Sequence, residues 1–243
     1  MFKIRRLNLM KLYPLWVLIF LLFSAFLACS LIVNRPDDSL YISAAESSER
    51  TVIILDAGHG GEDCGAIGVN GVYEKDLNLK ITFMIGEELQ KRGFAVVYTR
   101  TEDKLLYKPE ENIKGIRKIS DLKNRCDIAS RYPQALFISI HMNSFGQEKY
   151  SGTQVYASPS DGESRRLAES IRESVKRDVQ QENKRLVKEG NDIYVLKNTK
   201  NTAVLIECGF LTNKQECEKL SQKEYQKQLS FSIVCGIIEY IGK

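Results

Sequence analysis

The sequence predicts a single α/β domain with a roughly six-stranded, mostly parallel sheet flanked by helices, behind an N-terminal membrane segment. Short segments rich in Val, Ile, Phe and Tyr alternate along the chain with stretches in which apolar residues recur at helical spacing. Such alternation is typical of α/β domains with a parallel sheet. We therefore expect three parts: a signal or anchor segment at 1–33, a linker at 34–50 and one folded domain at 51–243.

An uncharged run of 22 residues at 12–33 marks the expected membrane segment. As a helix it would span about 33 Å, which is enough to cross a bilayer. Basic residues precede it at positions 3, 5, 6 and 11, and positively charged flanks stay in the cytoplasm. The folded domain is therefore expected outside the cytoplasmic membrane, on an uncleaved anchor. The segment Phe26-Leu27-Ala28-Cys29 leaves a lipoprotein signal as the alternative.

Composition excludes several other classes of protein. A mean hydropathy of -0.26 excludes a polytopic membrane protein, and 43% hydrophobic with 27% charged residues excludes a disordered or collagen-like chain. The net charge is +4, but six of the 35 Lys and Arg residues lie at or before Arg50. The folded domain is therefore close to neutral, and its charge gives no reason to expect nucleic acid as a partner.

Six segments have the composition of strands. They span 51–56, 94–99, 135–141, 153–157, 193–196 and 203–207. The last of them is apolar up to its final residue, Glu207, which predicts a central strand.

Between these segments, four stretches have helical spacing. The first has an apolar face that starts at Leu77, and it ends before Gly93, a residue typical of helix C-termini. The others are expected at 117–131, at about 163–183 and at 225–240, where the last helix closes the chain.

The chain has two histidines, and each stands where a predicted strand ends. His59 follows the first strand in a glycine-rich loop, and His141 ends the third strand. Glu207 ends the strand at 203–207, and a carboxylate there is costly unless it is solvated, paired or used. Because the carboxyl ends of strands in open α/β sheets meet where ligands bind, these three groups suggest one site.

A catalytic zinc ion takes three protein ligands, and two histidines with one glutamate are a common set. Glu74 is the best candidate for the third ligand, because it closes the glycine-rich loop after His59 and opens the next helix. The competitors are Glu62, Asp63 and Asp76. Glu207 would then be free to act as the general base for water and as the acid for a leaving amine.

Other interpretations of these residues remain. Strand-end histidines are often structural, Glu74 could simply favour its helix N-terminus, and Glu207 could be paired with a basic side chain. A phosphate-binding loop is excluded, because Asp63 stands where the dinucleotide pattern needs glycine and no P-loop motif follows. Cys64 or Cys208 could act as a thiol nucleophile, although Cys208 should point to the opposite face of its strand from Glu207.

Four ordered blocks resemble the zinc-dependent N-acetylmuramoyl-L-alanine amidases (the amidase 3 family). They are Ile54-Leu55-Asp56-Ala57-Gly58-His59-Gly60-Gly61, Glu74-Lys75-Asp76-Leu77-Asn78-Leu79, Ser139-Ile140-His141-Met142-Asn143-Ser144 and Val204-Leu205-Ile206-Glu207-Cys208-Gly209-Phe210-Leu211-Thr212-Asn213. The resemblance covers 51–243 and implies one zinc ion bound by His59, Glu74 and His141, with Glu207 as the catalytic carboxylate.

The resemblance also implies the substrate, peptidoglycan, cut at the amide between the lactyl group of N-acetylmuramic acid and L-alanine. The short layout behind an apolar segment is similar to the germination-specific cortex amidases of spore formers, which implies a step towards muramic δ-lactam. Some members carry an extra helix that blocks the zinc. We expect none here, so that control would come from timing of expression or from an activating partner protein.

The sequence also leaves two other functions open and suggests two further residues for the site. Another zinc-dependent wall peptide hydrolase, of carboxypeptidase type, would share the catalytic residues and differ in its product. A non-catalytic wall-binding module would not need all four of them. Asn143 and Arg100 are candidate substrate contacts, each with a structural alternative.

Overall fold

A central six-stranded sheet organises the computed structural model, which describes residues 51–113, 115–160 and 162–242. The strands are β1 (Val52–Ala57), β2 (Ala95–Tyr98), β3 (Leu136–Asn143), β4 (Gln154–Ala157), β5 (Lys188–Glu189) and β6 (Thr202–Phe210). Their order is β2-β1-β3-β6-β4-β5, and only β4 and its neighbour β5 run against the others. The predicted α/β domain with a mostly parallel sheet is confirmed. The predicted membrane segment and linker lie outside the described residues.

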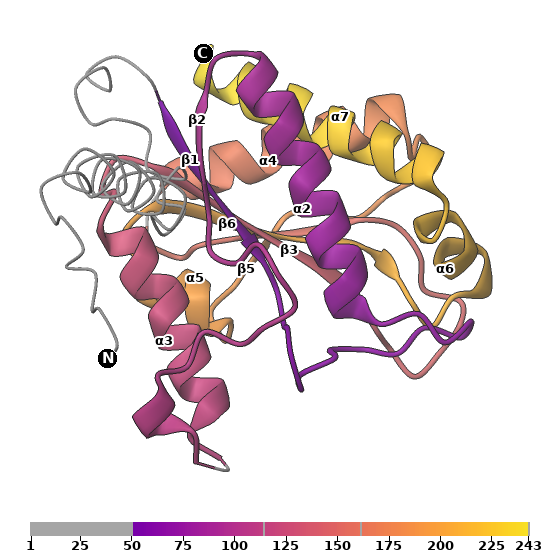
Figure 1. Cartoon of the computed structure of the whole chain (residues 1–243). Coiled ribbons are helices and arrows are strands. Elements are labelled where there is room, and N and C mark those ends of the chain that lie inside the picture. The colour runs from indigo at the N-terminus through magenta and orange to yellow at the C-terminus, as the bar shows by residue number, and fades with distance from the viewer. Residues whose placement is uncertain (1–50, 114, 161, 243) are drawn as a thin grey trace, which may run out of the picture. The chain divides into compact units, whose positions relative to one another are not determined.

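Helices cover both faces of this sheet (Figure 1). One face packs against α2 (Glu74–Lys91), α4 (Gly162–Asp178) and α7 (Lys223–Ile241), and the other against α3 (Arg117–Ser130) and α5 (Tyr194–Asn198). A short helix α6 (Lys214–Leu220) and a 3₁₀ turn η3 (Pro109–Glu111) complete the elements. A hydrophobic core lies on each face of the sheet, and successive side chains of a strand point alternately into the two cores because the strand is pleated.

The two longest strands, β3 and β6, lie side by side at the centre of the sheet. Their register pairs His141 with Glu207, so the two residues that end the predicted strands lie opposite each other. β1 pairs with β3 in parallel and ends at Ala57, two residues before His59. The carboxyl ends of β1, β3 and β6 therefore meet at one edge, which is where the candidate site residues are collected.

One predicted strand is wrong. The segment 193–196 lies in helix α5, whose Val195 and Leu196 are buried in the core beneath α3. A short apolar run fits a buried helix as well as a strand, and periodicity alone does not separate them. The sixth strand is β5, which consists of two exposed residues and so carries no apolar pattern that a sequence could reveal.

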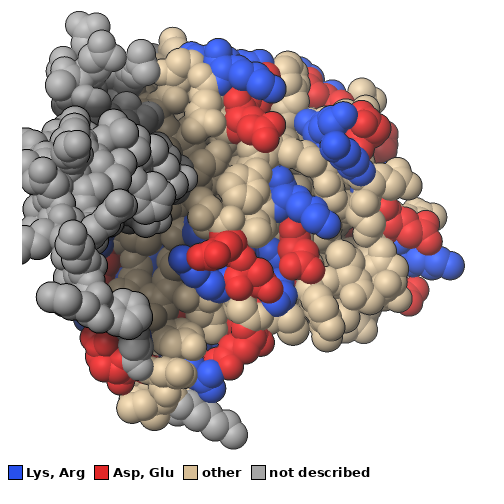
Figure 2. Space-filling model, in the orientation of Figure 1, with Lys and Arg blue, Asp and Glu red and all other residues tan. Residues whose placement is uncertain are grey.

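Most of the predicted helices begin and end close to the residues that the sequence indicates. α2 ends before Gly93, whose φ of +86° lies in the left-handed region that favours glycine. α4 is shorter than expected: it ends at Asp178, and beyond it the side chains of Gln180 and Asn183 bond the backbone of Thr153. No helix within the described ranges is long and apolar enough to cross a membrane. On the face shown in Figure 2, acidic and basic side chains are intermingled.

Candidate active site

The loop after β1 brings His59 to the edge of the sheet in a conformation that depends on its glycines. His59 itself has a φ of +61°, and Gly60 and Gly61 also have positive φ values. Gly58 donates its N–H to the carbonyl of Ile140 at 3.0 Å, which ties the loop to β3. A Cβ atom at Gly58 would lie 2.1 Å from the ring of His141, so the approach of the two histidines requires glycine there.

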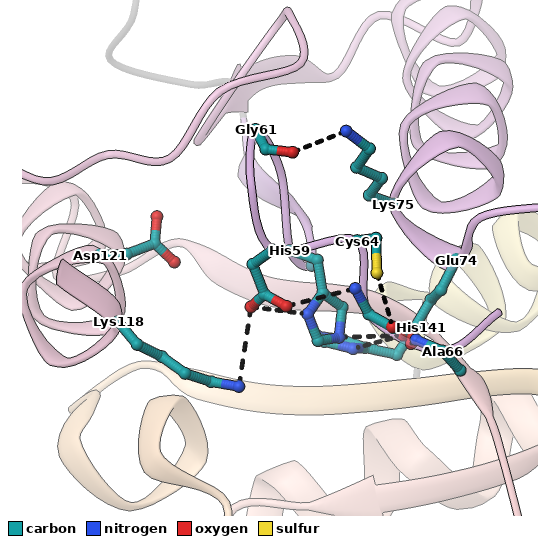
Figure 3. A network of polar contacts seen from close by, with 12 residues as sticks. His59, Gly61, Cys64, Ala66, Glu74, Lys75, Lys118, Asp121 and His141 are labelled. Atoms are coloured by element: carbon teal, nitrogen blue, oxygen red, sulfur yellow. Dashed lines mark hydrogen bonds and ion pairs between the residues drawn. The ribbon is translucent and has the colours of Figure 1, made fainter. Parts of the chain in front are cut away.

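Three possible metal ligands converge at this edge (Figure 3). Oε1 of Glu74 lies 3.2 Å from Nε2 of His59 and 3.0 Å from Nδ1 of His141. One atom from each residue lies within 4.8 Å of the other two, and this is the one such group of three among the described residues. His59 comes from the loop after β1, His141 from β3 and Glu74 from the first turn of α2, so three separate segments build the set.

Glu74 is held firmly in this position. It is 4% exposed, its Oε2 accepts the N–H of Ala66 at 2.8 Å, and its Oε1 accepts the N–H of Met142 at 3.1 Å. Burial opposes ionisation, but hydrogen bonds and charge interactions with His141 and His59 hold the pKa of Glu74 well below its usual range. The carboxylate is therefore ionised and faces the two imidazoles.

Asp63 supports His59 from the other side of the ring. Its Oδ2 lies 2.9 Å from Nδ1 of His59, while Nε2 faces Glu74. Burial lowers the pKa of His59, but Asp63 and Glu74 outweigh it and raise the value to about 9. A carboxylate on the outer nitrogen of a histidine is typical of metal-ligand histidines, because it fixes the ring orientation.

None of the competing carboxylates joins the convergent group. Asp63 lies on the far nitrogen of His59, and Glu62 pairs with Arg117. Asp76 does not belong to the convergent group, although it shares the first turn of α2 with Glu74.

Glu207 lies beside this group and has a free oxygen. Its Oε2 is buried and has no hydrogen-bond partner among the described residues. Burial is the main reason that the pKa of Glu207 is raised to about 7; the charge of Glu74 adds to it, and the two histidines oppose it. A carboxyl group poised near neutral pH can both take up and release a proton, which general acid–base catalysis requires.

The thiol alternative finds no support at Cys208. Cys208 is fully buried in the core beneath α2, α4 and α7, and burial raises the pKa of its thiol well above the usual range. It lies on the opposite face from Glu207, as the alternation along β6 predicts. A buried thiol of this kind is inert as a nucleophile.

Two buried arginines, which no sequence pattern assigns to this loop, hold the backbone around His59. Arg125 of α3 donates to the carbonyls of Ala57 at 2.7 Å and His59 at 2.9 Å. Arg100 donates to Ala57 at 2.9 Å and to Gly58 at 3.1 Å. Arg100 is 2% exposed, so its side chain serves the loop and is not open to a substrate.

The residues present suit a zinc ion. Two imidazole nitrogens and one carboxylate oxygen form a common three-ligand set for catalytic zinc, which leaves a position for water or substrate. The donor atoms already converge, the outer nitrogen of His59 has a carboxylate partner, and an unpaired carboxyl oxygen of Glu207 stands next to them. Such a site at the carboxyl edge of an α/β sheet is typical of metal-dependent hydrolases.

Comparison with known proteins specifies the class further. The sequence pattern of the N-acetylmuramoyl-L-alanine amidases (Amidase_3) matches residues 53–239, and the chain belongs to this family. The amidase activity expected from the four sequence blocks is thereby confirmed, as is the resemblance to germination-specific members.

Three relatives illustrate the similarity. The structure of the CwlD amidase from Clostridioides difficile in complex with the GerS lipoprotein has a TM-score of 0.76 at 42% identity, covering 79% of this chain and 99% of that one. The germination-specific N-acetylmuramoyl-L-alanine amidase of Bacillus subtilis is 35% identical over 191 residues, which is 78% of this chain and 79% of the relative. The B. subtilis protein YqiI is 39% identical over 199 residues, or 81% and 88% of the two chains.

Proposed function

We propose that this amidase cuts the bond between the lactyl group of N-acetylmuramic acid and L-alanine of peptidoglycan with one zinc ion held by His59, Glu74 and His141. Glu207 is the catalytic carboxylate, and residues 51–243 form the catalytic domain. The observation that carries this assignment is the convergence of the three donor atoms beside the unpaired, buried Oε2 of Glu207.

Zinc, when bound, supplies Lewis-acid chemistry, which makes a carbonyl carbon more electrophilic and water a stronger acid. The protein supplies the placement of that chemistry. Glu74 and the two histidines fix the donor atoms, and Asp63 fixes the ring of His59 through its outer nitrogen.

Glu207 carries the proton through the reaction. Its ionised carboxylate takes a proton from the attacking water as the water oxygen bonds to the lactyl carbonyl carbon. The same carboxyl group then returns the proton to the nitrogen of L-alanine as the carbon–nitrogen bond breaks. The products are a free lactyl carboxyl group and a stem peptide with a free amino end. The buried position of Glu207 raises the pKa of its carboxyl group, which helps it to hold the proton between the two transfers.

The test is a digest of purified peptidoglycan with the full-length protein, with and without a chelator, analysed by mass spectrometry. We expect stem peptides with free L-alanine amino ends, lost on chelation and restored by zinc. Release of a C-terminal amino acid instead would favour the carboxypeptidase-type alternative. Cleavage that survives complete removal of metal would overturn the zinc assignment.

The biological setting is proposed from the relatives. Because similar proteins are the germination-specific amidase and the CwlD amidase in complex with the GerS lipoprotein, we propose that this chain acts outside the membrane on spore cortex. Removal of the peptide would prepare muramic acid for conversion to the δ-lactam. The segment 1–33 would anchor the enzyme, and a lipoprotein partner would activate it.

Cortex from a strain that lacks the gene tests this setting. We expect that cortex to contain no muramic δ-lactam. An unchanged δ-lactam content would refute the cortex role and leave the amidase reaction itself untouched.

A further inference from the structure

A half-buried arginine without a carboxylate partner lies near the strand that carries Glu207. Arg185 donates from Nε to the carbonyl of Ser151 at 2.7 Å, and its guanidinium carbon lies 4.5 Å from the centre of the Phe210 ring. Within the described ranges, no carboxylate oxygen comes within 4.0 Å of its nitrogens. The guanidinium is thus fixed in place by stacking and by one backbone bond, with its charge not neutralised by an ion pair.

The position of Arg185 relative to Glu207 follows from the sheet. Gln154 of β4 lies directly opposite Glu207 in the antiparallel pair with β6, so the two side chains share one face. Nη1 of Arg185 lies 3.5 Å from Oε1 of Gln154. Phe210, on which the guanidinium stacks, lies three residues beyond Glu207 on β6, and at about 3.3 Å per strand residue this places the guanidinium on the order of 10 Å from Glu207.

The pKa of Tyr156 is a second indication that the charges of Glu207 and Arg185 lie near the same part of β4. Burial raises the pKa of this tyrosine, the charge of Glu207 raises it further, and the charge of Arg185 lowers it. Tyr156 follows Gln154 by two residues on the same face of β4. Glu207 and Arg185 therefore flank the same stretch of β4.

Arg185 also lines a pocket in which four basic side chains outnumber three acidic ones. The pocket has a volume of about 700 Å³, and its lining includes Lys149, Lys184 and Lys219. Two of its three acidic residues are occupied: the carboxylate of half-buried Glu216 accepts the N–H groups of Gly152 and Phe210, each at 2.8 Å, and Asp178 pairs with Arg177, while Glu182 is exposed. The volume lies in the range of small-molecule and peptide sites, and the unpaired cations favour an anionic ligand.

We propose that Arg185 binds a carboxylate of the peptidoglycan stem peptide and so positions the scissile amide at Glu207. The inference rests on the proposed function. An extended peptide advances about 3.3–3.6 Å per residue, so a span of about 10 Å places the bound carboxylate some three residues from the cut. The planar guanidinium suits a carboxylate because it can donate two parallel hydrogen bonds.

The test compares two soluble substrates of equal length: N-acetylmuramoyl-tetrapeptide with free carboxylates, and the same compound with those carboxylates amidated. We expect the parent enzyme to prefer the anionic substrate, mainly through a lower KM. Arg185→Gln should raise the KM for the anionic substrate about 10- to 100-fold and leave the KM for the amidated substrate unchanged. Arg185→Lys should recover part of the preference for the anionic substrate. Lysine keeps the positive charge, but it cannot donate two parallel hydrogen bonds to a carboxylate or stack a planar group on an aromatic ring.

Arg165→Gln, which removes an exposed arginine of α4 that pairs with Glu169, is the matched control and should behave like the parent. Equal losses of Arg185→Gln on both substrates would show a structural role and overturn the proposal. An unchanged preference for the anionic substrate in Arg185→Gln would overturn it as well. A parent enzyme that cleaves neither compound nor peptidoglycan would instead refute the proposed function.

Discussion

The guanidinium of Arg125 donates to the backbone oxygen of His59 at 2.9 Å and forms an ion pair with Asp56 at 2.7 Å. Both partners of the ion pair are almost completely buried, and Asp56 also accepts hydrogen bonds from Thr99 and Ser139. The position of a proposed zinc ligand therefore depends on a charged network between β1 and α3, beneath the loop that carries it.

Removing the charge of Arg125 should weaken zinc binding. In Arg125→Met the loop loses its bonds to the carbonyls of Ala57 and His59, and Asp56 is left as a buried charge without its partner. Breaking such a pair costs about 3–5 kcal/mol of folding free energy. We expect a lower unfolding midpoint in urea and a zinc affinity reduced about 10- to 100-fold, measured by competition with a chelating dye.

A second variant distinguishes a role of Arg125 in positioning His59 from a general loss of stability. Arg117→Met removes an arginine of the same helix that pairs with Glu62 at the surface. It should leave zinc affinity within about twofold, since an exposed pair contributes little. Wild-type zinc affinity in folded Arg125→Met would contradict the positioning role.

The same network should limit stability in acid. Burial opposes ionisation of Asp56, but Arg125, Ser139 and Thr99 outweigh it and lower its pKa below the ordinary value of 3.8. A group with a lowered pKa in the folded state stabilises the fold above its unfolded pKa and loses that contribution as pH falls. We expect the free energy of unfolding to decrease below about pH 4, and urea titrations between pH 3 and 6 measure it.

Asp56→Asn and an exposed control separate this effect from other carboxylates. Asp56→Asn should be less stable at pH 6 and should show a shallower decrease in acid. Asp127→Asn, on the exposed side of α3, should keep the full acid dependence. An acid dependence in Asp56→Asn as steep as that of the parent would show that other groups are responsible.

Loss of the Glu207 carboxylate should strongly reduce kcat and spare zinc binding. Glu207→Gln keeps the size of the side chain but removes the group that would accept the proton, so kcat should fall by a factor of about 10²–10⁴. Zinc content measured by atomic emission should stay at one ion per chain, because Glu207 lies outside the convergent donor set. A variant that hydrolyses peptidoglycan as fast as the parent would remove Glu207 from the mechanism.

The sequence was most informative where residues and strand ends coincide. His59, His141 and Glu207 each follow an apolar run long enough to predict a buried parallel strand, and parallel strands bring their carboxyl ends to one edge. The position of Glu74 at the start of an amphipathic helix, directly after a glycine-rich loop, supplied the remaining candidate ligand.

What the sequence missed depends on contacts between distant residues. Arg125 lies 66 positions from the carbonyl of His59 that it binds, and nothing in its own helix indicates that partner. Arg185 is marked only by the aromatic ring it stacks on and by the ion pair it lacks, both of which need three-dimensional coordinates. β5 was missed because its two residues are exposed and lack the alternation that marks a strand.

Glycine at position 58 should be indispensable for the metal site. A Cβ atom there would lie 2.1 Å from the ring of His141, so Gly58→Ala must displace a proposed ligand. Overpacking of this kind costs about 1–3 kcal/mol in stability, and displacement of His141 should lower zinc affinity by more than about tenfold. Gly146→Ala is the control, because nothing lies within 4 Å of its Cβ position. Isothermal titration calorimetry measures the zinc affinity of both variants. Equal zinc affinities would mean that the loop and His141 can separate without loss of the site.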